Sequence, residues 1–398
     1  MADTSFDTRC FSESYFAGRD RFRALAESLQ REFTDGVRLV SYPLSEHFGP
    51  LGETLSIDVC IVGDEEIIGQ IDASSQGENG AFSARPRRVM LHVSGTHGAE
   101  GFAGSAVQCA LLHSDLRKLL SGNSWNGTGH VCVFVHALNP FGMAHGRRVN
   151  ENSVDLNRNF YLNNEEFENH PTASGFLPLN SFLEMPNAPT LYDSLVFWPR
   201  AAYLIATHGL NTLKNTIATG QNLRPRSLFY VGTEQQFSTR TLLQLLRQLG
   251  AQEGTLERLV IVDVHTGLGA FSFDTLLSMD SDKTRMREVY GAEHVESDTG
   301  ESIAYTLDCD MGSGVAKFCS ESTDSFYACQ EFGTYAPVKM LHGLIWENAE
   351  FHANGRSGGE LLDLFYPRHS EQWKLQVLKR GVKVFHQALQ HCVDRGSD

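Results

Sequence analysis

The stretch VMLHVSGTHGAEGFAGSA, residues 89–106, decides how the first half of this chain folds. Its opening residues, Val89 to Val93, are apolar and β-prone, residues 94–96 interrupt them, and the residues after Gly101 lead into a helical pattern. A strand that turns directly into a helix is typical of an open α/β sheet, which carries its functional groups at the carboxyl ends of its strands. The turn between them holds His97 and Glu100, an imidazole and a carboxylate three residues apart.

Strand-like and helix-like segments alternate along the rest of the chain. This alternation predicts an α/β fold, a mixed and mostly parallel twisted sheet with helices on both faces. We expect a single domain over residues 1–398, with its motifs in about residues 55–350, and long loops at 151–187 and 267–314 beside the site. The predicted strands are 38–43, 55–63, 89–93, 130–138, 259–264 and 326–332, and the predicted helices are 20–33, 104–120, 196–207, 238–249 and 371–392.

Composition excludes several classes of protein. The 398 residues are 41% hydrophobic and 20% charged, as expected of a globular protein, and no apolar stretch is long enough to span a membrane. The formal charge of −15 argues against binding to nucleic acid or to an anionic membrane surface. The eight cysteines form no CxxC pair and the first residues do not resemble a secretory signal, so we expect reduced thiols and a cytoplasmic protein.

His97 and Glu100 are two-thirds of a catalytic zinc site of the His₂Glu type. The HxxE string is common, so these two residues alone favour a polar turn over a metal site. A third ligand is offered by His265, which follows the buried-type strand 259–264 and precedes a glycine-rich turn. Strand carboxyl ends converge on one crevice, so His265 can meet the first pair there. His208, at the end of a predicted helix, is the rival third ligand.

Arginines gather in the segment 139–160, which is unusual in an acidic protein. Arg147 and Arg148 are adjacent, and Arg158 follows Asn157 ten residues later. An arginine guanidinium is always protonated and its fork matches carboxylates and oxyanions, so these residues are candidates for binding substrate. The alternative is a structural network in which the arginines pair with Glu151 and Asp155.

Five motifs together resemble the zinc metallocarboxypeptidase clan, the proteins with the carboxypeptidase A-like fold. They are HGAEG (97–101), NPFG (139–142), RRVN (147–150), VDLNRNF (154–160) and VDVHTG (262–267). The strings GTEQQFSTRTL (232–242) and QEFGTY (330–335) are similar to a branch of this clan known only as a domain of unknown function. The resemblance covers about residues 55–350 and implies a three-layer sandwich of helices and sheet.

The resemblance implies a role for each matching residue. One zinc ion per chain would be bound by His97, Glu100 and His265, and the substrate's terminal carboxylate by Asn157 and Arg158. The arginine that polarises the scissile carbonyl would be Arg148, with Arg147 as the alternative, and the general base would be Glu331, with Glu347 and Glu350 as less favoured rivals on a helix surface. The motifs do not show which residue of this chain corresponds to the family's active-site tyrosine. The candidates are Tyr230, Tyr305 and Tyr335. Asp263 is expected on the strand face opposite His265, and so is not expected to support that ligand.

Three functions are compatible with these residues. The favoured one is a zinc carboxypeptidase that acts on small peptides or peptide-like amides with a free carboxylate. The second is an aspartoacylase-like zinc amidohydrolase that cleaves N-acyl amino acids, which predicts the same metal site. The third is a non-catalytic binding protein that keeps the fold, which predicts that a ligand or the base has been lost. The complete Asn157–Arg158 pair favours the peptidase, and the sequence does not indicate the oligomeric state.

Overall fold

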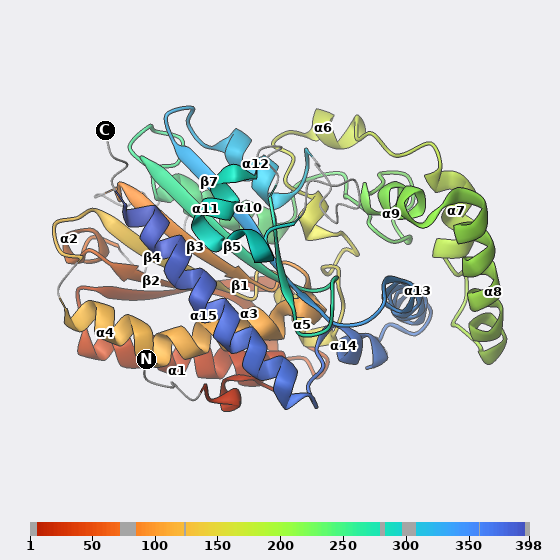
Figure 1. Ribbon diagram of the computed structural model, residues 1–398, viewed down its shortest axis with the longest axis horizontal. Helices are drawn as coiled ribbons and strands as arrows, with labels where there is room; N and C mark the ends of the chain where they lie inside the picture. The colour runs from red at the N-terminus through yellow and green to blue at the C-terminus, as the bar shows by residue number, and fades with distance from the viewer. Residues whose placement is uncertain are drawn as a thin grey trace.

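The computed structural model describes residues 6–71, 85–122, 125–278, 283–296, 308–357 and 359–394. Within them, seven strands form one sheet in the order β1-β2-β4-β3-β5-β7-β6 (Figure 1). The strands are β1 (Val37–Phe48), β2 (Thr54–Gly63), β3 (Arg88–Ser94), β4 (His130–His136), β5 (Arg258–Gly267), β6 (Asp274–Leu277) and β7 (Asp324–Gly333).

The sheet is mixed, with a parallel centre. Strand β3 pairs in parallel with β4 and β5, and β5 pairs in parallel with β7. The pairs β1–β2, β2–β4 and β6–β7 are antiparallel. It follows that β1, β3, β4, β5 and β7 all point the same way, which confirms the predicted mixed, mostly parallel sheet.

Helices connect these strands, and many of them are short. The helices of the described residues are α1 (Tyr15–Glu32), α2 (Glu65–Ile68), α3 (Gly101–Ala110), α4 (Leu116–Ser121), α5 (Pro140–His145), α6 (Asn164–Glu168), α7 (Phe176–Leu183), α8 (Leu191–His208), α9 (Leu210–Ala218), α10 (Phe237–Gln248), α11 (Thr284–Tyr290), α12 (Met311–Phe318), α13 (Pro337–Asn354), α14 (Glu360–Phe365) and α15 (Glu371–Val393). Within the described part of the chain, none of them has the length and apolar character needed to cross a membrane.

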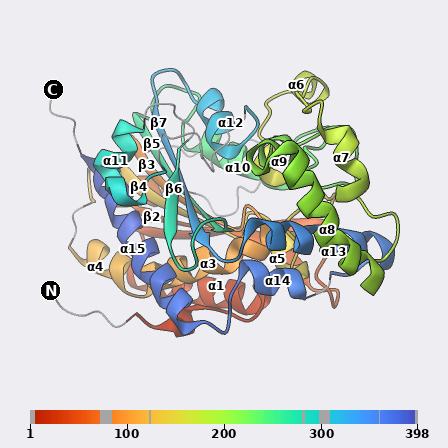
Figure 2. The same ribbon diagram turned by 45° about the vertical axis from the view of Figure 1, so that its right-hand side comes forward.

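Helices cover both faces of the sheet (Figures 1 and 2). Helices α1, α3 and α15 pack on one face, and α10 and α12 pack on the other. Successive residues of β3 contribute to the two cores in turn, Met90 to the first and Leu91 to the second. Because both faces are buried, β3 has an almost continuous apolar sequence, as in other parallel sheets.

A third apolar cluster lies beside the sheet, at the right of Figure 1. It is formed by α7, α8, α9, α13 and α14, with Phe182, Phe197, Leu213 and Leu344 among its buried residues. This helical group lies next to the end of the sheet at which the candidate ligands are found.

Two predicted boundaries are corrected by the structure. Residues 267–314 are not one long loop, since they include β6, which pairs with the edge of β7, and helix α11. The helix predicted at 104–120 begins at Gly101 and is interrupted by a π-helical turn at Leu111–Asp115. A four-residue edge strand and a one-turn change in helix type leave too little periodic signal to be read from sequence.

Candidate metal centre

His97, Glu100 and His265 meet because β3 and β5 are parallel neighbours. The two strands pair in register up to Ser94 and Val264. His97 is the N-cap of the 3-10 turn (Gly98–Glu100) that follows β3, and Glu100 is the last residue of that turn. His265 is the third residue from the carboxyl end of β5. The carboxyl ends of both strands therefore deliver their side chains to the same edge of the sheet.

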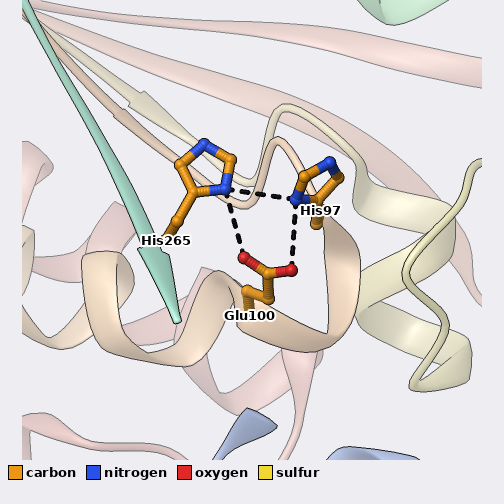
Figure 3. A group of neighbouring side chains, drawn as sticks. All are labelled: His97, Glu100 and His265. Carbon is orange, nitrogen blue, oxygen red and sulfur yellow. Dashed lines mark hydrogen bonds and ion pairs between the residues drawn. The ribbon is translucent and has the colours of Figure 1, made fainter. Parts of the chain in front are cut away.

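The three side chains present four mutually close donor atoms (Figure 3). His97 Nδ1 lies 3.1 Å from Glu100 Oε1, and His265 Nδ1 lies 3.1 Å from Glu100 Oε2. The two Nδ1 atoms are 3.1 Å apart. Donors held 2.0–2.1 Å from a tetrahedral zinc ion are about 3.3 Å from one another, so these spacings fit one small ion between them. The three residues could thus hold a metal ion.

The far nitrogen of each imidazole is held by a carboxylate. His97 Nε2 lies 3.0 Å from Asp155 Oδ1, and His265 Nε2 lies 2.6 Å from Asp263 Oδ2. A carboxylate can only accept, so each Nε2 is the protonated nitrogen, and a neutral ring then presents a lone pair at Nδ1. In that form the lone pairs of both Nδ1 atoms face the carboxylate oxygens of Glu100, an arrangement that a cation at their centre would stabilise. Carboxylate partners of this kind are usual for histidines that bind metals.

Charge is concentrated around these buried groups. Burial raises the pKa of the Glu100 carboxyl, but His97, His265 and Arg148 outweigh it and hold this pKa well below its usual value. Burial likewise disfavours the charged form of His265, yet Asp263 and Glu100 raise its pKa well above 6.5. A divalent cation bound here would compete with protons for the same Nδ1 atoms.

The turn that carries His97 and Glu100 lies directly against the backbone of Gly142. A Cβ atom on Gly98 would lie 2.0 Å from the carbonyl carbon of Gly142, so the two backbones touch only because residue 98 is glycine. The amides of Gly98 and Ala99 donate to the carbonyls of Arg148 and Arg147 at 3.1 and 2.7 Å. The HGAEG, NPFG and RRVN motifs are thus parts of one backbone unit.

The two adjacent arginines lie in different places. Arg148 is at the site, donating to Glu100 Oε1 at 2.9 Å and to Asp155 Oδ2 at 3.1 Å. Arg147 is fully buried behind it, where it donates to Glu347 at 2.8 Å and lies over the ring of Phe351. Arg147 therefore has a structural role, whereas the sequence alone did not show which of the two arginines, Arg147 or Arg148, lies at the site.

Asn157 and Arg158 both line the cavity next to the candidate metal ligands. The Arg158 guanidinium is fixed by two backbone carbonyls, those of Ala218 at 2.8 Å and Asn157 at 2.7 Å. Asn157 Oδ1 accepts from the Met311 amide at 3.0 Å. Among the hydrogen bonds and ion pairs of the described residues, Arg158 donates to carbonyls and to no carboxylate, so its charge is available to an anionic ligand.

Glu331 lies on β7, directly opposite His265 of β5 in the parallel register. It is buried, lines the same cavity, and accepts from the Leu268 amide at 2.9 Å. Burial, followed by the negative charge of Glu100, raises the pKa of Glu331 to about 7. Of the two rival glutamates, Glu347 is not on a helix surface but buried against Arg147, and Glu350 accepts from Asn354 on the next turn of α13.

The cavity in front of these residues has a volume of about 220 Å³. The polar side chains described above form one wall. The remaining walls are mostly apolar and come from α7, α8, α9, α13 and α14, and Lys214 of α9 is a cation among them. An engineered cavity of about 150 Å³ accepts benzene, so the space is large enough for a sizeable apolar group.

Three expectations change at this site. Asp263 does support His265, because residues two apart on a strand share a face, and the expectation of opposite faces was wrong.

His208 is exposed on α8 and lies outside the ligand group. Tyr305 lies outside the described residues, and the tyrosine that lines the cavity is Tyr327, whose hydroxyl lies 3.3 Å from Asp263 Oδ2. Tyr327 belongs to β7 four residues before Glu331, the one signal that could have found it.

Asparagine at position 263 tests the support given to His265. Asp263→Asn keeps the shape of the side chain but removes the negative charge that fixes the protonated Nε2. We expect metal affinity to fall by about 10- to 100-fold, measured by competition with a chelating dye. Asp324→Asn, at an ion pair near the opposite end of β7, is the matched control and should leave the affinity unchanged. Equal affinities in Asp263→Asn and the unaltered protein would contradict the assignment.

Comparisons with known proteins find one matching family model and several similar solved structures. The model described as "Protein of unknown function (DUF2817)" matches residues 79–380. A search of curated proteins finds no match. Solved structures similar to this chain include carboxypeptidase A from Helicoverpa armigera, at 13% identity and a TM-score of 0.48, covering 97% of this chain and 76% of that one. Bovine thrombin-activatable fibrinolysis inhibitor is similar at 10% identity and a TM-score of 0.48, covering 97% and 100%. Murein-tripeptide amidase from Escherichia coli O157 is similar at 16% identity and a TM-score of 0.35, covering 79% and 91%.

Proposed function

The chain belongs to the DUF2817 family, and from that premise we propose that it is a zinc-dependent hydrolase that cleaves the C-terminal amide bond of small peptides or peptide-like substrates. One observation carries the proposal: the donor atoms of His97, Glu100 and His265 converge at 3.1 Å beside a cavity that Glu331 and Arg148 also line. Metal ligands, a base and a fixed cation in one enclosed space are what amide hydrolysis requires.

The chain's own residues divide the chemistry between them. A zinc ion held by the three ligands would act as a Lewis acid and bring the pKa of a water molecule close to neutrality. Glu331, with its raised pKa, would accept a proton from the attacking water and deliver it to the leaving amine. Arg148 would place its charge near the developing oxyanion, where its hold on Glu100 and Asp155 keeps it oriented.

Arg158 and Asn157 would bind the substrate's free carboxylate. The two backbone carbonyls that fix Arg158 leave its charge without a carboxylate partner among the described residues. A guanidinium held in advance loses little conformational entropy when it binds an anion. This arrangement supports a substrate that carries a free carboxylate in the same cavity as the scissile amide.

The apolar walls of the cavity also support a second candidate function, that of an aspartoacylase-like amidohydrolase of N-acyl amino acids. The residues contributed by α8, α9 and α13 could accept the hydrocarbon part of an acyl group as well as an apolar side chain. Both functions use the same ligands and the same base. They differ in whether the group next to the scissile carbonyl is an amino acid or a simple acyl chain.

We also propose that the protein works in the cytoplasm. All eight cysteines lie among the described residues and are free thiols. Unpaired thiols in this number are expected of a reducing compartment.

The proposed activity is tested by metal analysis together with a substrate panel. The purified protein is expected to hold about one zinc per chain, and to hydrolyse peptides with a free C-terminus or N-acyl amino acids only when loaded. Release of the C-terminal amino acid from peptides alone would identify the peptidase, and release from N-acyl amino acids alone would identify the deacylase. A protein that takes up zinc yet hydrolyses neither class would contradict both.

Arg158→Ala should impair substrates with a free carboxylate selectively. Loss of a charge-assisted hydrogen bond costs about 1.5–3 kcal/mol, so we expect kcat/KM to fall by roughly 10- to 150-fold on these substrates. The same peptides with amidated C-termini provide the comparison, since they carry no anion for Arg158 to bind. An equal fall on both sets would show that Arg158 does not recognise the carboxylate.

A further inference from the structure

Helix α8 is apolar on two sides. On its inner side, Phe197 stacks on Phe182 of α7, and Ala201, Leu204 and Ile205 line the cavity. A helix that is apolar all round is normally buried all round. Helix α8 instead lies at the outer edge of the molecule, at the far right of Figure 1.

The outer side of α8 carries two adjacent apolar rows. One row is Leu191, Leu195, Trp198 and Ala202, and the other is Tyr192, Val196, Pro199 and Tyr203, all of them exposed. Both rows follow a spacing of four, three and four residues, which places their members on one stripe of the helix surface. This is the spacing with which helices pack against one another.

We infer that this outer face of α8, defined by these eight residues, is the interface through which two copies of the chain form a symmetric dimer. The inference is independent of the proposed function, because it depends on the outer face alone.

The exposed apolar area is of the size that a dimer needs. Tyr192, Trp198 and Tyr203 are 72%, 47% and 66% exposed. At 150–250 Å² for each aromatic side chain, their exposed parts amount to roughly 280–460 Å². Leu191 and Leu195, which are 87% and 75% exposed, extend the patch further. A stable interface takes about 800 Å² from each partner, so the three aromatic residues alone supply roughly a third to just over half of it.

The first row of this face is also complementary to itself. If two α8 helices cross antiparallel on a twofold axis between residues 196 and 197, Leu191 of one lies opposite Ala202 of the other, and Leu195 opposite Trp198. Asp193 and Arg200 lie off this stripe: Asp193 forms the capping box with Thr190, and Arg200 donates to Ser181 of α7. An isologous interface requires this kind of self-complementarity. With one charge of each sign and no lysine, α8 has little to attract a charged partner or an anionic membrane.

A dimer built on α8 would also fix one wall of the cavity. The residues that line the cavity and those of the outer face alternate along the same helix, for example Ala201 and Ala202. Covering the outer face would therefore restrict the movement of this wall relative to α9 and α13.

Sedimentation equilibrium of the full chain tests the inference. The unaltered protein is expected to be a dimer at micromolar concentration. Leu195→Glu places a carboxylate at the centre of the interface, and should raise the dimer dissociation constant by at least about 30-fold. Ala202→Glu, at the end of the same row, is a second variant with the same expected direction. Both replaced side chains are exposed, so melting temperatures should remain within a few degrees of the unaltered protein.

Leu51→Glu is the matched control, because Leu51 is 89% exposed in the turn between β1 and β2. It should leave the dimer intact. A monomer at concentrations up to about 50 μM, or equal dissociation in Leu51→Glu, would overturn the inference. So would a monomer that co-sediments with phosphatidylcholine vesicles and loses this binding in Leu195→Glu, since the face would then bind a neutral lipid surface instead.

Discussion

Replacing Glu331 with glutamine is expected to lower kcat by about 10²- to 10⁴-fold while leaving the metal content of the protein unchanged. Glutamine has the same shape and can still accept from the Leu268 amide, but it cannot take a proton from water. Glu331 is not one of the three grouped ligands, so its loss should not release the metal. Turnover and metal content measured on one preparation give both results.

The matched control is Glu350→Gln, since Glu350 lies on α13 outside the cavity lining of the described residues. Its activity should equal that of the unaltered protein. An unchanged rate in Glu331→Gln, or a large loss in Glu350→Gln, would remove Glu331 from the role of base.

The pH profile follows from the same residue. A general base works in its ionised form, so kcat/KM should fall as the pH drops below the pKa of Glu331. Burial and the charge of Glu100 raise that pKa to about 7, and Arg148 and a bound cation act in the opposite direction. The acid limb of the profile is therefore expected between the ordinary carboxyl pKa of about 4.3 and pH 7.

His265→Ala is expected to lower metal affinity by more than about 100-fold and to abolish activity. Removing only a carboxylate that supports a ligand costs about 10- to 100-fold, and here the ligand itself is lost. The remaining His97 and Glu100 leave too few donors for a small cation. Isothermal titration with zinc measures the affinity, and thermal unfolding without metal checks that the buried substitution has not disrupted the fold.

His208→Ala provides the comparison because His208 was the rival third ligand and is exposed on α8. It should bind zinc as the unaltered protein does. The reverse ranking, with affinity lost in His208→Ala and kept in His265→Ala, would contradict the assignment of the ligands.

Local sequence patterns were sufficient for the main elements of the sheet. The apolar runs at 89–93, 259–264 and 326–332 became β3, β5 and β7, because a strand buried on both faces has few polar residues to interrupt it. Short elements escaped detection. Strand β6 has four residues and depends on the exposed edge of β7 for its hydrogen bonds, so its own sequence contains little evidence of it.

The roles of neighbouring residues could not be separated by sequence alone. Arg147 and Arg148 are adjacent and chemically identical, yet one pairs with Glu347 of α13 and the other with Glu100 and Asp155. Which of them reaches the site depends on contacts up to 200 residues away in the chain. Glu347 was predicted on a helix surface for the same reason. It is buried instead, because it pairs with Arg147, which belongs to a distant segment of the chain.

The sequence by itself determined the class of sheet, because strand periodicity and turn composition are local properties of the chain, and its motifs, through their resemblance to a family, singled out residues that lie around the candidate metal centre. Only the tertiary structure decided which of those residues touch. Parallel pairing of β3, β5 and β7 brings His97, His265 and Glu331 to one edge, and the packing of α7, α8, α9 and α13 encloses the apolar cavity in front of them. These contacts join segments separated by more than 100 residues, and their geometry follows from how the buried surfaces fit together.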